Sequence, residues 1–247
     1  MEAYLTSITG IDDAICSMFE SKRNLTREKE MEIRAEVASC TRSLFDPENP
    51  DAVIGRLEDP SEKLCGWLET LCKWGQKHIT MLRFVNLGFT LYGIHRGAQD
   101  DFDSHAMRLN SRIIRASTRT ADFAGDEMSE FYQGKILTMD MALKHLDIKL
   151  PDEIEVDGKT YVKAVNGYIL KGLENEHDVK RGLYPLCIPS DFISQCNLTE
   201  FSHIYKLRNY DGTAHYELQT AVESLQMQLC SASAGYFDRS LLLAIEN

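Results

Sequence analysis

Four arginines between residues 102 and 120 are the first feature of this sequence that suggests chemistry. They are Arg108, Arg112, Arg115 and Arg119, at spacings of four, three and four residues. On a helix these spacings place all four side chains in one stripe of positive charge. In an acidic protein such a stripe predicts a binding site for an anion. The alternative is a solvated helix face whose arginines pair with nearby carboxylates.

Short motifs that identify common enzyme classes are missing. The sequence has no G-x-G-x-x-G after a strand, no G-x-x-x-x-G-K, no G-x-S-x-G and no H-E-x-x-H. Phosphoryl transfer through a P-loop, serine hydrolysis at a nucleophile elbow and zincin-type hydrolysis therefore lack sequence support. No two of the seven histidines lie three or four residues apart, the spacing that presents two ligands on one helix face. We therefore expect no metal site.

Length and charge narrow the choice of partners. The 247 residues are enough for one large domain or two small ones. The formal charge of −11 repels phosphate backbones and anionic lipids, so we expect neither a nucleic-acid nor a membrane partner.

The seven cysteines form no C-x-x-C pair, which indicates reduced thiols and a cytoplasmic protein. No apolar run approaches the roughly 20 residues needed to cross a bilayer.

The elements that position these residues can be predicted from hydrophobic spacing. Residues 25–45 predict an amphipathic surface helix, and residues 61–75 predict a helix with one buried face. In residues 84–94 apolar side chains recur at every second position in part of the segment, which predicts a strand with one buried face. Residues 192–205 and 214–229 are predicted to form two further helices. The second has an apolar face of Leu218, Ala221, Val222, Leu225 and Leu229.

Residues 121–180 are interpreted as an elaboration within one domain of residues 1–247. A short helix is predicted at 136–146. It is followed by a β-hairpin whose turn is Asp157-Gly158, a dipeptide typical of tight turns between strands. The chain has no internal repeat, low-complexity tract or convincing linker.

Three segments of the C-terminal half stand in a recognisable order. They are Arg181-Gly-Leu-Tyr-Pro185-Leu-Cys-Ile-Pro, then Asn197-Leu-Thr-Glu-Phe-Ser-His203-Ile-Tyr-Lys-Leu-Arg208, then Ala214-His-Tyr-Glu-Leu. This order resembles the flavin-dependent thymidylate synthases. In that family an R-x-x-L-P segment precedes an N-L-R-S-like helix that ends in L-R, and H-A-Q-x-E-I follows. The three pieces align without a gap.

The N-terminal half resembles the same family more loosely. Gly75-Gln-Lys-His78-Ile-Thr80-Met-Leu-Arg83-Phe84 is similar to the family's G-H-x-S/T-x-x-E-H, with Arg83 and Phe84 replacing the Glu and the second His. The family signature R-H-R-x-x-S-x-N-E-x-S-x-R-Y corresponds to residues 104–120, where only fragments are kept. His105 fits the middle of R-H-R, or Ser117 and Arg119 fit the S-x-R end, but one gapless register does not serve both.

The resemblance implies a fold and a reaction. The fold is α/β, a central and mostly antiparallel sheet flanked by helices, assembled as a homotetramer because the family builds each site from several subunits. The reaction is methylation of dUMP at C5 by a flavin enzyme. FAD is the cofactor, methylenetetrahydrofolate the one-carbon donor and NADPH the reductant. The changed signature places the flavin in question.

The resemblance also implies roles for single residues. Arg208 is the expected catalytic residue, polarising the pyrimidine, and Arg181 is expected to bind the nucleotide. Further substrate ligands are Arg115, Ser117 and Arg119. The flavin contacts are His78, Thr80, His105, Asn197 and His203.

Several of these residues also have an ordinary structural interpretation. Arg208 at a helix end can neutralise terminal carbonyl groups, Arg181 can form a surface salt bridge, and Asn197 can cap its own helix. For the whole chain, the alternative is a diverged, non-flavin pyrimidine-nucleotide-binding or assembly protein without synthase activity.

Overall fold

The central element is a four-stranded antiparallel sheet in the order β1-β4-β9-β5. The computed structural model describes residues 1–44, 46, 48–49, 52–106, 112–115, 128–212 and 215–245, with the backbone alone at 103–106 and 112–115. The strands are β1 (Glu2–Thr9), β4 (Asn86–Tyr92), β9 (Phe192–Asn197) and β5 (Arg112–Arg115). The predicted fold class, a mostly antiparallel sheet flanked by helices, is confirmed.

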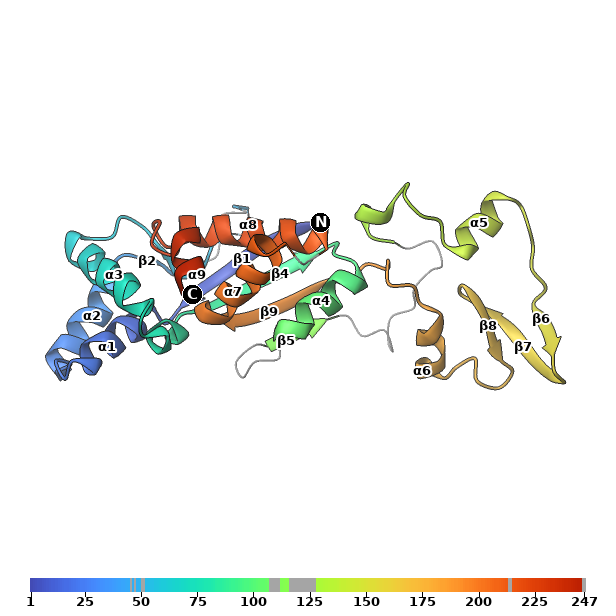
Figure 1. Ribbon diagram of the computed structural model, residues 1–247, viewed down its shortest axis with the longest axis horizontal. Coiled ribbons are helices and arrows are strands. Elements are labelled where there is room, and N and C mark those ends of the chain that lie inside the picture. The colour runs from blue at the N-terminus through green and yellow to red at the C-terminus, as the bar shows by residue number, and fades with distance from the viewer. Residues whose placement is uncertain are drawn as a thin grey trace.

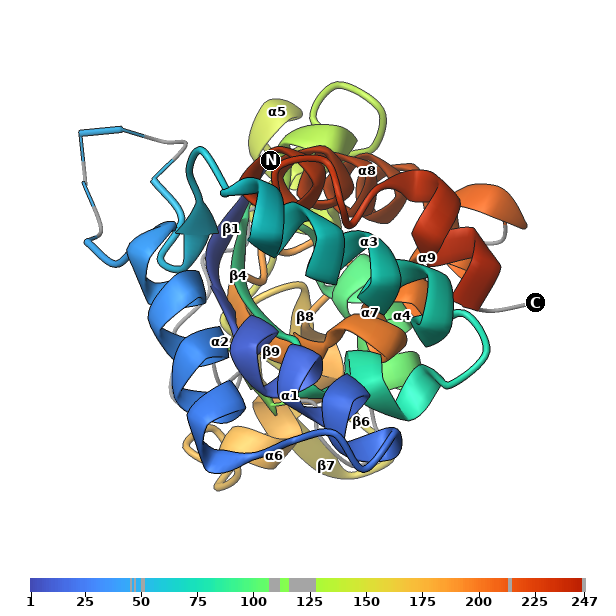
Figure 2. The same cartoon turned by 90° about the vertical axis from the view of Figure 1, so that its left-hand side faces the viewer.

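Helices cover one face of this sheet (Figure 1, Figure 2). They are α4 (Arg96–Ala106), α7 (Leu198–Tyr205), α8 (Tyr216–Ala232) and α9 (Arg239–Ile245). The helix α8 packs along β1, α7 packs on β9 and α9, and α4 contacts both α7 and α8. No helix within the described ranges is long and apolar enough to cross a membrane.

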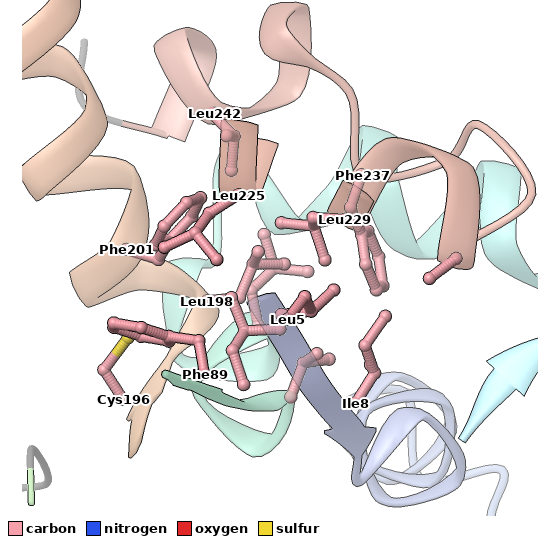
Figure 3. Packing of buried hydrophobic residues seen from close by; sticks show 14 of the residues in the cluster. Leu5, Ile8, Phe89, Cys196, Leu198, Phe201, Leu225, Leu229, Phe237 and Leu242 are labelled. Carbon is pink, nitrogen blue, oxygen red and sulfur yellow. The ribbon is translucent and has the colours of Figure 1, made fainter. Parts of the chain in front are cut away.

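The core lies between the sheet and these helices. Leu5 of β1 pairs with Phe89 of β4, and both side chains are buried. Figure 3 shows them together with Phe201 of α7 and Leu225 of α8. The rings of Phe89 and Phe201 meet edge to face with centroids 6.4 Å apart, a geometry favoured by aromatic quadrupoles. The predicted apolar face of residues 214–229 is confirmed, because its five members are fully buried.

Three helices close one end of the sheet: α1 (Ile11–Ser21), α2 (Arg27–Ser39) and α3 (Glu62–Gly75). The predicted helices at 25–45 and 61–75 are confirmed, although α2 ends at Ser39. Thr26 Oγ1 accepts from Lys29 N at 3.2 Å, and Ser61 Oγ accepts from Leu64 N at 3.2 Å, so each helix begins at a capping side chain. A two-stranded ladder of β2 (Thr41–Arg42) and β3 (Arg56–Leu57) and a 3₁₀ helix, η1 (Ile79–Phe84), complete this end.

A second, three-stranded sheet stands beyond the other end of the main sheet (Figure 1). It contains β6 (Glu153–Val156), β7 (Lys159–Ala164) and β8 (Gly167–Leu170), and α5 (Met139–His145), α6 (His177–Lys180) and a 3₁₀ turn, η3 (Arg181–Leu183), accompany it. We call residues 136–184 the lobe. The predicted short helix is confirmed as α5. The predicted hairpin is confirmed too, with φ of 48° at Asp157 and 72° at Gly158, as its tight turn requires.

One predicted helix is wrong, and so is the single helix on which the four arginines would form a stripe. Residues 192–205 are not one helix but β9 followed by α7. Phe192, Ser194 and Cys196 are buried while Ile193 and Gln195 are exposed, an alternation of period two that marks a strand. The four arginines do not share one helix, because α4 ends at Ala106 and residues 112–115 form β5. Successive residues of a strand alternate between its two faces, so a spacing of three does not keep residues on one face.

Candidate functional site

Arg208 is the predicted catalytic residue, and the fold buries it. It lies in a π-helical turn, η4 (Lys206–Tyr210), that directly continues α7. Only 6% of Arg208 is exposed, and its Nη2 donates to the carbonyl oxygen of Asp101 in α4 at 2.6 Å. Burial lowers the pKa of Arg208 and the nearby Asp101 raises it, but a guanidinium stays charged in proteins. Turns of this kind are rare and are often found at functional sites.

The sequence around Arg208 fixes the position of this turn. Asn197 Oδ1 accepts from Glu200 N at 3.0 Å and starts α7, whose apolar side chains are buried in the core. At the other end, Asn209 Nδ2 donates to the carbonyl of Gln219 at 2.7 Å and ties η4 to α8. Gly212 follows with φ of 68°, a conformation that favours glycine and ends the helical path.

A buried polar network lies at the start of both α4 and α8. His95 Nδ1 and Glu217 Oε2 are 2.5 Å apart, and the backbone N–H of His95 donates to the same oxygen at 3.0 Å. Ser129 Oγ donates to Glu217 Oε1 at 3.1 Å, and Tyr132 Oη lies 3.3 Å from His95 Nε2. His215 adds a second imidazole, with its ring centroid 4.3 Å from that of His95. We call these five residues the His95 cluster.

The charges in the His95 cluster follow from these contacts. Burial raises the pKa of Glu217, but hydrogen bonds from His95 and Ser129 outweigh burial, so the net pKa is lowered and the carboxylate is ionised at neutral pH. Burial, together with the neighbouring His95, lowers the pKa of His215. Burial also raises the pKa of the Tyr132 hydroxyl, with Glu217 adding to the effect. The cluster therefore combines an anion, a neutral imidazole and a hydroxyl donor.

Aromatic rings shield this cluster. Phe131 lies with its ring centroid 4.6 Å from His215 and 6.3 Å from His95, and Lys135 Nζ sits 3.4 Å from the centroid of the Phe131 ring. Phe131 and Tyr132 belong to a short 3₁₀ turn, η2 (Glu130–Tyr132), just before the lobe. Such rings lower the local dielectric, which strengthens the electrostatic interactions inside the cluster.

Arg208 and the His95 cluster are neighbours through α4. Asp101 accepts from Arg208 by its carbonyl oxygen, and its charge also acts on His215. Asp101 follows His95 by six residues, so α4 links the buried guanidinium to the imidazole and carboxylate network. The guanidinium of Arg208 offers donors of a kind that suits a planar, anionic ligand.

The predicted flavin contacts His78 and Thr80 lie together on η1. They line a surface hollow of about 420 Å³, together with Ser17, Ser21, Lys77, Ile79, Met81 and Phe84. The hydroxyls of Ser17 and Ser21 donate to the carbonyl oxygens of Ala14 and Met18 in α1. The lining holds no carboxylate, and Lys77, His78 and Thr80 supply ammonium, imidazole and hydroxyl groups. This donor set fits a phosphate group.

Two other predicted flavin contacts belong to α7. Asn197 is its capping residue, and its Oδ1 also accepts from Thr199 Oγ1 at 2.6 Å. The structural alternative considered for Asn197 is therefore observed. His203 is half-buried, six residues further along the helix. Neither residue lines the hollow at η1.

Arg181 lies far from Arg208 in the chain as folded. It begins η3 in the lobe, and its Nη1 donates to Asp178 at 3.2 Å. Its side chain is 39% exposed, so the surface ion pair that was its alternative interpretation is present. Figure 1 shows α6 within the lobe and α7 over the main sheet.

The remaining predicted site residues fall at the edge of the described chain. Arg115 is the last residue of β5, and the backbone of His105 lies in α4. Ser117 and Arg119 lie outside the described residues, as does Arg108 of the predicted stripe. Their predicted roles as anion ligands stay predictions.

Sequence reasoning did not assign a role to His95, Ser129, Tyr132, His215 or Glu217. His95 and Glu217 are 122 residues apart in the chain, so no local spacing reveals their contact. The sequence signal was that His215 and Glu217 both fall in the segment Ala214-His-Tyr-Glu-Leu, which resembles the thymidylate synthase family. The ligand atoms of His95, His215 and Glu217 lie within 4.8 Å of one another, a feature that the spacing of histidines along the sequence does not predict.

The fold is similar to solved structures of flavin-dependent thymidylate synthases. Thymidylate synthase X (ThyX) from Helicobacter pylori, solved with FAD and dUMP, matches with a TM-score of 0.55 and 15% identity, over 98% of this chain and 100% of that chain. A second structure of the H. pylori enzyme with FAD and dUMP gives 0.54 and 14%, over 98% and 99%. The UMP/dUMP methylase PolB from Streptomyces cacaoi, bound with 5-Br dUMP, gives 0.52 and 10%, over 96% and 92%.

Sequence comparison alone does not detect this likeness. No protein-family model matches the chain, and no curated protein matches it. The resemblance inferred from the C-terminal segments is confirmed at the level of the fold, over nearly the whole chain.

Proposed function

We propose that this protein binds a pyrimidine nucleotide of the dUMP type and methylates it at C5 with the help of FAD. The observation that carries the proposal is Arg208, which is buried in a π-helical turn at the position where the sequence resembles the family's L-R segment. The fold supports it, because the similar structures from H. pylori hold FAD and dUMP.

The chemistry of a uracil ring explains why a buried arginine suits this reaction. The ring becomes nucleophilic at C5 when negative charge on N3 and the carbonyl oxygens is stabilised. A guanidinium offers a planar fork of donors that carries a permanent positive charge. Because Arg208 is almost fully buried, water does not screen that charge, and its effect on a bound ring is large.

The hollow at η1 is the part of the chain that fits the flavin cofactor. Lys77, His78 and Thr80 offer donors suited to a pyrophosphate, and about 420 Å³ accommodates a part of FAD. When bound, FAD supplies the redox chemistry of the one-carbon transfer. In the same proposal methylenetetrahydrofolate is the one-carbon donor and NADPH the reductant.

A complete site requires more than one copy of the chain. Arg181 is exposed in the lobe while Arg208 is buried under α4 in the main body. If both arginines hold one nucleotide, Arg181 comes from a neighbouring subunit. We therefore propose a homotetramer in which the lobe of one subunit completes the nucleotide site of another.

Titration calorimetry tests the nucleotide site. Purified protein is titrated with dUMP, with FAD and with AMP as an unrelated nucleotide. We expect heat with dUMP and FAD but not AMP. Arg208→Gln weakens dUMP binding by about 2 to 4 kcal/mol, roughly 30- to 1000-fold, because a charge-assisted donor is lost from a desolvated site. Arg208→Lys, which keeps the charge without the fork, gives a smaller loss.

The matched control is Arg27→Gln, an exposed arginine at the start of α2, which leaves dUMP binding unchanged. Circular dichroism checks that each variant is folded. Heat with dUMP alone, and a colourless protein that does not take up FAD, supports the alternative of a non-flavin nucleotide-binding protein. No heat with dUMP rejects the proposal.

Mixed assemblies test the shared site. Arg181→Gln and Arg208→Gln are each expected to be inactive alone. Co-expression of the two chains regenerates about a quarter of the sites with both arginines if these come from different subunits. A mixture as inactive as either variant contradicts the shared site, whereas a monomer in light scattering contradicts the tetramer.

A further inference from the structure

The fold brings two imidazoles and a carboxylate together in a buried place. His95 precedes α4, while His215 and Glu217 stand at the start of α8. Their ligand atoms lie within 4.8 Å of one another. We propose that His95, His215 and Glu217 bind a zinc ion. This inference goes beyond the proposed function, which requires no metal.

The existing contacts are close to those of a zinc site. Zinc binds imidazole nitrogen and carboxylate oxygen at about 2.0 to 2.2 Å, so two ligand atoms of a tetrahedral site lie roughly 3.3 Å apart. His95 Nδ1 and Glu217 Oε2 are now 2.5 Å apart and share a proton. When zinc takes the place of that proton, the ring proton of His95 moves from Nδ1 to Nε2, and the two atoms separate by less than an ångström.

The surroundings hold each ligand in place. Ser129 Oγ donates to Glu217 Oε1, while Oε2 accepts from the backbone N–H of His95 and offers its other lone pair to the metal. With His95 Nδ1 bound to zinc, His95 Nε2 carries the ring proton and donates to Tyr132 Oη, now 3.3 Å away. Such outer hydrogen bonds fix the ring and the tautomer of a zinc-bound histidine. The Nδ1 of His215 accepts from Glu217 N at 3.3 Å and caps α8, and ligation through Nδ1 replaces this long hydrogen bond.

The electrostatic balance also suits a cation. Glu217 supplies one negative charge, and Asp101 acts on His215 from α4. Lys135 is the opposing charge, and it is held over the Phe131 ring. Three protein ligands leave one tetrahedral position open, which is typical of catalytic rather than structural zinc.

Metal binding to the whole protein tests the proposal. The protein is stripped with a chelator, exchanged into chelator-free buffer and titrated with Zn²⁺, and in parallel with Co²⁺ as a spectroscopic probe. We expect about one metal per chain by elemental analysis after gel filtration, and the visible bands of four-coordinate Co²⁺. The seven cysteines are free thiols that can also bind Co²⁺, whereas the proposed site has no sulfur ligand, so Co²⁺ in this site must show no thiolate charge-transfer band.

Variants assign the site. His215→Ala and Glu217→Gln are expected to weaken metal binding by more than about tenfold, and His177→Ala, an exposed histidine of the lobe, leaves it unchanged. If the Glu217→Gln variant does not fold, metal binding by the His215→Gln variant decides, because His215 is only half-buried. Absence of metal binding, a thiolate band or full binding in the folded His215 variants overturns the proposal. Nucleotide binding is measured separately, so its loss does not affect this result.

Discussion

The main body and the lobe of this protein differ in how they are held together. In the main body, strands from both ends of the chain are joined in one sheet, and the side chains beneath its helices are fully buried. In the lobe, β6, β7 and β8 form a sheet of local hairpins, and Ile169 is a rare buried apolar residue there. In the same region Leu137 and Leu146 are more than half exposed, and Ile148 is half exposed.

This difference suggests a division of roles. A large buried core gives the main body the rigidity that a site around Arg208 needs. A small sheet with one or two buried side chains is only marginally stable by itself. The exposed apolar residues of the lobe are consistent with its proposed position against another subunit, where they would be covered.

The largest expected effect is the loss of stability when a core side chain of the main body is truncated, compared with a truncation in the lobe. Phe89 is fully buried and touches Phe102 and Phe201, so Phe89→Ala should destabilise the protein by about 3 to 5 kcal/mol through lost contacts and a cavity. Val156→Ala in the lobe, where the side chain is 47% exposed, should cost less than about 0.5 kcal/mol. Urea unfolding followed by circular dichroism measures both. Equal losses would contradict the contrast between the regions.

A smaller effect concerns alkaline pH and the main body. Burial raises the pKa of the Cys72 thiol from 9.0 to about 12, with Asp238 adding to the effect. The unfolded thiol ionises above pH 9 while the folded thiol stays neutral, so the stability associated with Cys72 is complete below pH 9 and falls as pH rises toward 12. The urea midpoint should fall between pH 9 and 11, and Cys72→Ala should flatten this dependence. A variant as sensitive to pH as the parent protein would exclude Cys72 as a cause.

The smallest expected effect on stability is in the lobe. Arg181 and Asp178 form an exposed ion pair, and such pairs contribute less than about 1 kcal/mol. Asp178→Asn should therefore leave the thermal midpoint almost unchanged, and so should Arg181→Gln. Only the arginine variant should lose dUMP binding, because the proposed role of Arg181 lies in a neighbouring site. Loss of binding in both variants would show that the pair acts as a unit.

Local patterns predicted much of the main body. The capped helices α2 and α3, strand β4, the apolar face of α8 and the Asp157-Gly158 turn all depend on residues within a few positions of one another, so the sequence alone reveals them. The boundary between β9 and α7 did not follow from local patterns. Residues 192–197 alternate over only six positions and run directly into a helix, so the two periods merge.

The candidate site was predictable only in part. Arg208 was recognised through a segment that resembles a family, and its burial agrees with the role expected of it. The His95 cluster was not recognised, because its members come from three separate segments. Whether Arg181 and Arg208 hold the same nucleotide depends on how the subunits assemble.

The sequence by itself determined which segments are amphipathic, where helices are capped and which arginine to suspect, because those properties depend on neighbours along the chain. Only the tertiary structure decided that His95 meets Glu217 across 122 residues. It also decided that Arg208 lies beside Asp101 and that Arg181 stands apart in the lobe. Such contacts arise from the pairing of distant strands and the packing of helices on one face of the sheet, and no local spacing encodes them.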